Sequence, residues 1–240
     1  MDGITPRLLP ACASDISCSL SALFNRSFTE AAFPFAWKHS LAVPVFKRGE
    51  RNNPSNYRPI ALLSVVGKVC ERIVFNQLYL FLTPHLVHHQ SGFCKKDSTS
   101  LPLLRLVQKW SEAVDSSNYV GATFFFYLRK AFDRVWHKGL LAKLEAAGIH
   151  GSALSWFESC LSGRLQCTKV DNAVSHPAPV LASVPQGAIL SPLLFLVYVN
   201  DIPHSSEINT NLFDDDTSAY VCPVAICSSS GCSRHFASMV

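Results

Sequence analysis

Three consecutive carboxylates, Asp214, Asp215 and Asp216, stand between two short runs of β-forming residues, Ile208–Phe213 and Thr217–Cys222. The flanking runs predict a β-hairpin with the acids at its tip. Carboxylates this close together repel one another unless a cation neutralises them, and carboxylate oxygens are the ligands that Mg²⁺ and Mn²⁺ prefer. A solvated turn is the alternative, because Asp is a common turn residue. On the triplet alone both interpretations stay open.

The elements that would position these acids follow from the hydrophobic pattern. Helices are expected over 15–28, 68–82, 103–115, 138–147 and 191–201, and strands over 41–46 and 119–127. Ser14 or Asp15 would cap the first helix. Helices and a partly antiparallel sheet are segregated along the chain, so we expect the α+β class. The strand 119–127 is rich in β-formers, and we expect it to be central, with Phe124–Phe126 in the core.

Composition sets the limits of these expectations. The 240 residues are 48% hydrophobic and 16% charged, which is a globular composition, and the formal net charge of +4 allows a polyanionic partner. The longest apolar stretch, Pro192–Val199, is far shorter than the roughly 20 residues of a membrane helix. The first residues have no apolar signal-peptide core, and the nine cysteines are scattered. We therefore expect an intracellular protein, nuclear or cytoplasmic and not secreted, without membrane contact.

Seven segments, in order along residues 2–222, resemble those of reverse transcriptases from non-LTR (LINE-type, jockey-like) retrotransposons. They are FPFAWKHSLAVPVFKRGE (33–50), NYRPIALLSVVGKVCERIV (56–74), QSGFCKKDSTSLPLL (90–104), KAFDRVWHKGLLAKL (130–144), GIHGSALSWFESCLSGRLQ (148–166), SVPQGAILSPLLFLVYVNDIP (183–203) and LFDDDTSAYV (212–221). One such segment alone would be weak, but seven in the family's order are very specific.

The resemblance implies an RNA-directed DNA polymerase with a right-hand fold. It implies fingers and their connection over 1–118, an antiparallel palm sheet packed on helices over 119–222, and no thumb. The Ser- and Cys-rich tail, 223–240, has no hydrophobic periodicity, so we expect it to lack regular structure. It also implies an RNA template, a DNA primer, dNTPs and two Mg²⁺ or Mn²⁺ ions. Such a polymerase adds nucleotides to a primer 3′-hydroxyl by two-metal nucleotidyl transfer.

The resemblance carries roles onto particular residues. Asp215 and Asp216 fall on the metal-binding aspartate pair. Phe132 falls on the aromatic gate beneath the sugar, and Gln186 and Gly187 fall on the turn that contacts the dNTP. Lys47 and Arg58 match basic residues that hold the triphosphate. Further basic residues could follow the template backbone, although each of them taken alone is better explained as a surface charge: Lys38, Arg48, Arg51, Lys68 and Arg72.

The chain also departs from the family pattern. Tyr127 stands where the family has the metal-binding Asp of its first palm strand, and a neutral phenol is a poor ligand for Mg²⁺. Ser183 replaces a Gly, Ala188 a Ser and Cys94 an Arg. We therefore expect a truncated, catalytically impaired copy. An active polymerase, a non-catalytic nucleic-acid-binding remnant and an unstable pseudogene product are the three alternatives.

Overall fold

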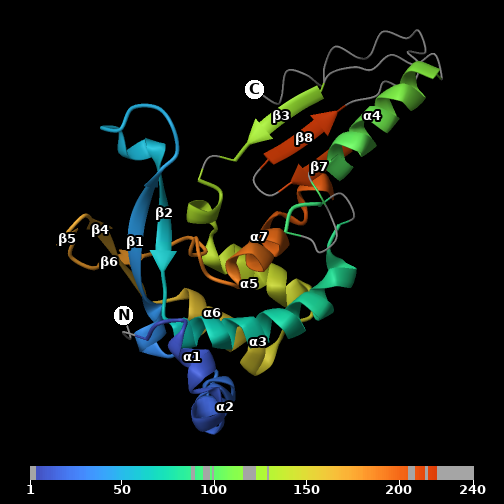
Figure 1. The fold of residues 1–240 in the computed structure, drawn as a ribbon. Coiled ribbons are helices and arrows are strands. Elements are labelled where there is room, and N and C mark those ends of the chain that lie inside the picture. The colour runs from blue at the N-terminus through green and yellow to red at the C-terminus, as the bar shows by residue number, and fades with distance from the viewer. Residues whose placement is uncertain are drawn as a thin grey trace. The chain divides into compact units, whose positions relative to one another are not determined.

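The structure, a computed structural model, describes residues 4–87, 90–93, 98, 100–115, 123–128, 130–204, 209–213 and 216–220. The chain divides into two compact units, which are described separately below (Figure 1). The first unit comprises Met1–Val87 and Arg129–Asp201, and the second comprises His88–Leu128 and Ile202–Val240.

The first unit contains a five-stranded sheet with the order β2-β1-β4-β5, in which β6 also pairs with β4. Its strands are β1 (His39–Phe46), β2 (Tyr57–Leu62), β4 (Arg164–Val170), β5 (Ala173–Val174) and β6 (Ala178–Val180). β1 and β2 form an antiparallel hairpin, whereas β1 and β4 run parallel. The strand predicted over 41–46 is confirmed, and the Lys47 N–H donates to the Asn56 carbonyl at 2.8 Å to close the hairpin.

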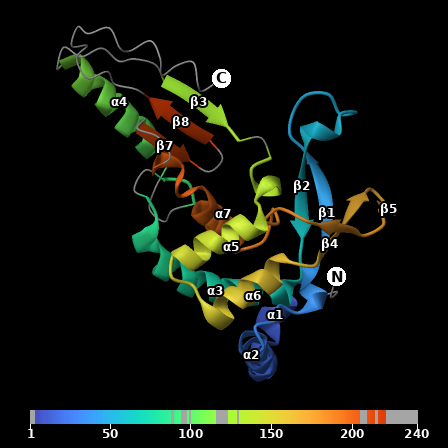
Figure 2. The same cartoon turned by 180° about the vertical axis from the view of Figure 1, so that it is seen from behind.

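Helices make up the rest of the first unit. They are α1 (Leu8–Ala11), α2 (Ala13–Thr29), α3 (Val65–Leu82), α5 (His137–Ala146), α6 (Gly151–Leu161) and α7 (Ser191–Val199), with short 3₁₀ turns η1 (Phe35–Lys38), η2 (Pro54–Asn56), η3 (Thr83–His85) and η4 (Phe132–Arg134). α7 is buried on all sides, as its continuous apolar sequence predicts. Seen from behind, α7 lies against α5, which in turn packs on α6 (Figure 2).

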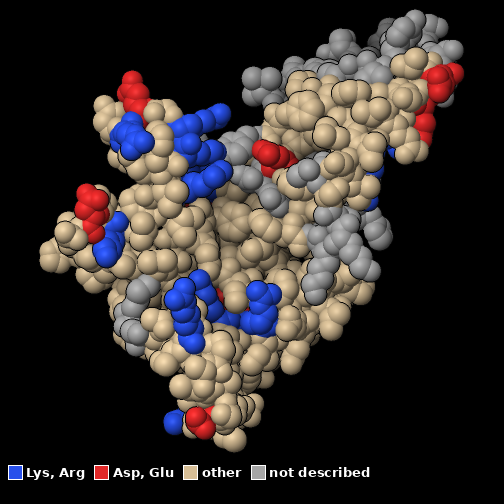
Figure 3. Space-filling model, in the orientation of Figure 1, with Lys and Arg blue, Asp and Glu red and all other residues tan. Residues whose placement is uncertain are grey.

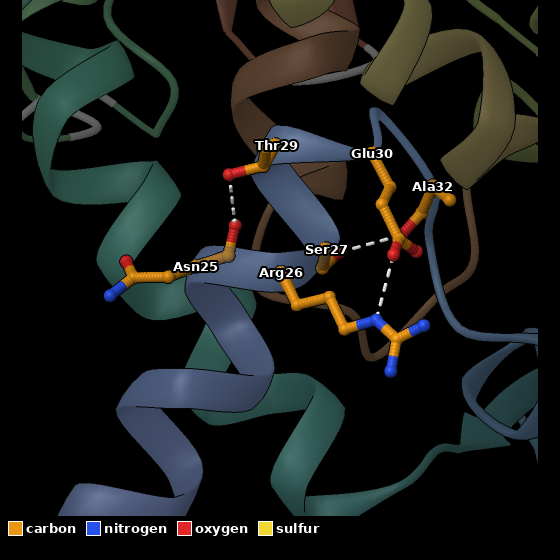
Figure 4. Close-up of polar contacts among 6 residues, drawn as sticks. All are labelled: Asn25, Arg26, Ser27, Thr29, Glu30 and Ala32. Carbon is orange, nitrogen blue, oxygen red and sulfur yellow. Dashed lines mark hydrogen bonds and ion pairs between the residues drawn. The ribbon is translucent and has the colours of Figure 1, made fainter.

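Two of these helices, α2 and α5, are followed by a residue in the left-handed conformation. Gly148 follows α5 in a left-handed conformation with φ +97°, for which glycine is the favoured residue. Ala31 takes the same role after α2 with φ +50°, although it carries a Cβ. The end of α2 is tied down by an Arg26–Glu30 ion pair and by the Ser27 hydroxyl, which donates to the Ala32 carbonyl at 2.7 Å (Figure 4). At the other end of α2 the predicted side-chain cap is wrong: the N-cap is Cys12 and no side chain bonds there.

The second unit is a three-stranded antiparallel sheet with a helix. The strands lie in the order β3-β8-β7, and their bounds are β3 (Thr123–Tyr127), β8 (Asp216–Tyr220) and β7 (Asn209–Phe213). The helix α4 (Ser100–Asp115) and the 3₁₀ turn η5 (Ile202–His204) both contact β7. The predicted hairpin is confirmed, since β7 and β8 pair from Asn209↔Tyr220 to Phe213↔Asp216. The helix predicted over 103–115 is also confirmed.

One expectation about β3 is wrong. Among the described residues β3 is an edge strand, and the side chains of Phe124, Phe125 and Phe126 are 45%, 72% and 51% exposed. A strand buried on both faces needs a neighbour on each side and a layer on each face. β3 pairs only with β8 in the described part of the chain, so its apolar composition does not place it in a core.

The α+β class is confirmed by the mixture of separate helices and antiparallel-rich sheets. The fingers and palm boundaries stay predictions, and residues 223–240 lie outside the described part of the chain. Within that part, the structure contains no helix of the length and hydrophobicity needed to cross a membrane.

Candidate functional site

The turn between residues 183 and 190, which precedes α7, is held by backbone hydrogen bonds from other elements of the first unit. The Ser183 and Val184 N–H groups donate to the Val135 and Phe132 carbonyls at 3.0 and 2.9 Å. On the other side, the Ala61 N–H of β2 donates to the Gln186 carbonyl at 2.7 Å. The turn is therefore fixed between η4 and β2, two elements far from it in sequence.

Gly187 is where the turn comes closest to β2. Its φ is +120°, and a Cβ built on it would lie 2.7 Å from the Ala61 carbonyl oxygen. Both the backbone conformation and the lack of space therefore require glycine here. Gly187 was predicted to permit close backbone approach to a nucleotide; in the structure it permits close approach to β2.

Gln186 and Phe132, two of the predicted nucleotide-contacting residues, lie on neighbouring segments. The Gln186 side-chain amide donates to an Asp133 carboxylate oxygen at 3.3 Å. Burial raises the pKa of the Asp133 carboxyl, and the hydrogen bond from Gln186 opposes the shift. Phe132 is half-buried and stacks on Phe195 of α7, with ring centroids 4.7 Å apart and planes 16° apart. Phe132 thus packs against the core and stays partly exposed.

A buried acid, Glu71, meets the other end of the turn. The Glu71 side chain comes from α3 and is 4% exposed, and one carboxylate oxygen accepts from the Ile189 N–H at 2.7 Å and the Leu190 N–H at 3.3 Å. Burial raises the pKa of Glu71, while these two N–H donors and Arg164 act in the opposite direction. Glu71 therefore satisfies backbone donors at the start of α7 that the helix itself leaves without partners.

Ser183 carries the strain of the turn. Its φ is +123°, in the region that favours glycine, and it is the position where the family pattern has Gly. The His137 ring nitrogen Nε2 lies 2.8 Å from the Ser183 carbonyl oxygen. The substitution noted in the sequence thus falls on a residue whose backbone conformation disfavours a side chain.

Lys47 and Arg58 lie on the β1–β2 hairpin. Arg58 is opposite Val45, and the Lys47 N–H bonds across to Asn56, so alternation puts Lys47 and Arg58 on one face of the hairpin. Figure 3 shows basic side chains gathered over this hairpin, where the exposed ones are Lys47, Arg48, Arg51 and Arg58. The hairpin therefore presents a compact positive surface suited to phosphate groups.

The acidic hairpin belongs to the second unit. Asp216 is the first residue of β8 and is exposed, whereas Asp214 and Asp215 lie outside the described residues. In the ladder between β3 and β8, Tyr127 is the register partner of Asp216. The last residue of the Phe-rich strand and the first residue of β8 are thus side by side.

A divalent ion at this bend would be held by carboxylate oxygens. Opposite Asp216 the register supplies a phenol-bearing residue where a metal site needs a carboxylate. Among the residues that the structure describes, no group of three His, Cys, Asp or Glu side chains is close enough to hold a metal ion. Asp215, the other predicted ligand, lies outside the described residues, so the two-ion site stays a prediction.

The structure brings Phe132, Gln186 and Gly187 together in the first unit, and Tyr127 and Asp216 in the second. Sequence reasoning missed Glu71 and Asp133. Glu71 did carry a signal, because it lies four residues after Gly67 and seven before Leu78, on the buried stripe of α3. An acid on such a stripe indicates a specific partner.

Most of the chain is similar in sequence to known proteins. Residues 45–224 match the family described as reverse transcriptase (RNA-dependent DNA polymerase). The chain is 34% identical over 220 residues to the RNA-directed DNA polymerase from mobile element jockey of Drosophila melanogaster, a match that covers 90% of this chain and 23% of that protein. It is 35% identical over 190 residues to the probable RNA-directed DNA polymerase from transposon BS of the same species, covering 77% and 20%.

A solved structure with a similar fold is that of apo telomerase from Candida tropicalis truncated from the C-terminal domain. Its TM-score is 0.54 at 12% identity, and the match covers 85% of this chain and 48% of that one. This likeness concerns the fold alone. The chain spans about a fifth to a quarter of the length of the curated relatives it matches.

Proposed function

The chain belongs to the reverse transcriptase family of non-LTR retrotransposons, and we propose that it retains the nucleotide-binding and template-binding parts of an RNA-directed DNA polymerase while its two-metal catalysis is impaired. The observation that carries the proposal is the register of the second sheet, in which Tyr127 is the partner of Asp216.

The chemistry of the family explains why this pairing matters. Nucleotidyl transfer to a primer 3′-hydroxyl depends on positioning and charge neutralisation more than on covalent chemistry. Two divalent ions supply the neutralisation, and carboxylates on adjacent strand ends would hold them. In this chain Asp215 and Asp216 would supply two carboxylates, and Tyr127 replaces the third. A neutral phenol neither offers the charge nor binds Mg²⁺ well.

The first unit supports the binding half of the proposal. Gln186 is held by Asp133, and Phe132 is stacked on Phe195, so both have restricted rotamers before a ligand arrives. We propose that Gln186 and Gly187 contact the dNTP, that Phe132 lies beneath its sugar, and that Lys47 and Arg58 bind its triphosphate.

The experiment is primer extension on poly(rA)·oligo(dT) with dTTP, in Mg²⁺ and in Mn²⁺, together with equilibrium binding of dTTP and of the duplex. We expect both ligands to bind and extension to be weak or absent. Robust extension by the chain as written would refute the impairment. If the chain fails to bind dTTP or fails to bind the duplex, the proposed binding of that ligand is refuted.

A binding role without catalysis is the second candidate, and the basic hairpin favours it. Phosphate contacts release counterions, so duplex affinity should fall steeply with salt. Lys47→Ala and Arg58→Ala should each reduce the salt slope by about one. A salt-independent affinity would argue against this role for the hairpin.

A further inference from the structure

Glu71 is a buried carboxylate outside the residues proposed to bind the nucleotide and the metal ions. Its side chain is 4% exposed, in the middle of α3, and one of its oxygens receives both the Ile189 and the Leu190 N–H. Removing a buried carboxylate from water is costly unless hydrogen bonds and opposite charges compensate. A leucine or alanine would avoid the cost, so the two backbone bonds are what the acid provides.

The compensation comes from three sources. The N–H groups at the start of α7 point toward the carboxylate, and the dipole of that helix favours a negative charge at this end. Arg164 and Lys68 add positive charge nearby. Arg164 is itself 4% exposed and donates to the Cys160 carbonyl at 2.8 Å, so its position is fixed as well. Glu71 is thus held in place before it acts on the turn.

β2 and Glu71 form hydrogen bonds with the turn on opposite sides of Gly187. Ala61 bonds to the Gln186 carbonyl, one residue before Gly187, and Glu71 bonds to the Ile189 N–H, two residues after it. β2 ends at Leu62 and α3 begins at Val65, with Ser64 accepting from the Gly67 N–H as its N-cap at 3.1 Å. One continuous segment, β2–α3, therefore forms hydrogen bonds with the turn on both sides of Gly187.

We propose that Glu71 is a positioning residue for the incoming nucleotide, because it fixes the backbone that presents Gln186 and Gly187. The inference rests on the proposed nucleotide-binding role of that turn. Glu71 itself does not touch the nucleotide; it acts through the Ile189 and Leu190 amides. Without it, two amides at the start of α7 would lose their acceptor and the turn would be held on one flank only.

The test uses the full chain and three variants. In Glu71→Ala, hydrogen exchange of the Ile189 and Leu190 amides should quicken by about tenfold or more, and the Kd for dTTP should rise about tenfold, in Mg²⁺ with a 3′-dideoxy-terminated oligo(dT)·poly(rA) duplex. Glu71→Gln keeps an acceptor oxygen without the charge, so both changes should be about threefold. The Kd for the duplex alone should stay within about twofold in all variants.

Glu158→Ala is the matched control, because Glu158 is an exposed acid on α6 of the same unit, and it should change none of these values. If Glu71→Ala does not fold, Glu71→Gln decides: unchanged amide exchange and unchanged dTTP affinity overturn the proposal. Equal losses of dTTP and duplex binding also overturn it, because they indicate a general structural role. If the unmodified chain does not bind dTTP, the proposed function falls and this inference with it; if it binds and Glu71→Ala binds equally well, only this inference falls.

Discussion

The turn at residues 183–190 and the acidic hairpin are built in different ways. The turn donates hydrogen bonds to the η4 segment and to Glu71 of α3 and accepts one from β2, and its closest approach to a neighbour leaves no room for a Cβ. The hairpin is joined to β3 by a regular strand ladder, and Asp216 at its bend is exposed. Backbone geometry dominates the first region and side-chain chemistry the second.

The departures from the family pattern follow this difference. Ser183 lies in the turn and places a side chain on a backbone conformation that favours glycine, so its cost should fall on stability. Tyr127 lies at a strand end, where tyrosine is a good β-former and the ladder with β8 is complete, so its cost should fall on chemistry. A departure from the family pattern should therefore change the stability of the fold little at Tyr127 and lower it at Ser183.

The largest expected effect is that of Tyr127→Asp, which tests the hairpin. Restoring a carboxylate opposite Asp216 should raise the rate of Mn²⁺-dependent dTTP addition by at least about a hundredfold, because a group that stabilises developing charge is worth about this much or more. The free energy of unfolding should change by less than about 1 kcal/mol. Single-nucleotide extension and urea unfolding measure the two quantities. A variant no faster than the parent would show that the third acid is not what limits catalysis.

Next is Gly187→Ala, which tests the turn. The added Cβ would meet the Ala61 carbonyl oxygen at 2.7 Å, and φ is +120°, so we expect a loss of about 3 kcal/mol in the free energy of unfolding. Gly163→Ala is the control, because φ is +63° there and nothing lies within 4 Å. That control isolates the backbone cost, about 1 kcal/mol. Equal losses for the two variants, measured by urea unfolding, would show that the turn is not closely packed on β2.

The elements that could be predicted from sequence are those with a local signal. α7 follows from a continuous apolar run, the end of α5 from Gly148, and the β7–β8 hairpin from two β-forming runs around acids. The strand β4 was missed, because Arg164–Val170 alternates poorly and is a strand through its parallel pairing with β1, about 125 residues away. Pairing over such a distance leaves little trace in a local pattern.

The candidate site divides in the same way. Gln186, Gly187 and Asp216 could be found because they stand in recognisable motifs. Asp133 and Glu71 could not be assigned a role, because their partners, Gln186 and the start of α7, are 53 and 118 residues away. The exposed β3 shows the converse: its phenylalanines predict burial, but burial depends on neighbouring layers that a strand's own sequence does not specify.

A smaller effect is expected from Ser183→Gly, which tests whether the turn is strained. The gain from relieving φ +123° exceeds the added flexibility of the unfolded chain, so the free energy of unfolding should rise by about 1 kcal/mol. Ser162→Gly is the control, because φ is −85° there, and it should lose about 0.5 kcal/mol. Extension activity should not recover in Ser183→Gly, since the hairpin is unchanged. Recovery of activity would contradict the division between a stability cost and a chemical cost.

The smallest expected effect is that of Ala31→Gly. Ala31 is a left-handed residue outside the proposed site, so the stability gained there is a reference for the strain at Ser183. Ala31 follows α2 with φ +50°, and its N–H donates to the Phe28 carbonyl at 3.2 Å while the Ala32 N–H donates to the Ser27 carbonyl at 2.9 Å. Glycine is favoured at such a helix end, so the free energy of unfolding should rise by about 0.5 kcal/mol.

The matched control for Ala31→Gly is Ala147→Gly at the end of α5, where φ is −77° and glycine brings flexibility without relief of strain, so that variant should lose about 0.5 kcal/mol. The comparison that matters is with Ser183→Gly. A gain at Ala31 as large as the gain at Ser183 would mean that the turn stores no more strain than an ordinary helix end. If the gain at Ala31 is about half the gain at Ser183, the turn stores more backbone strain than the helix end, because β2 and η4 hold Ser183 and its neighbours in one conformation.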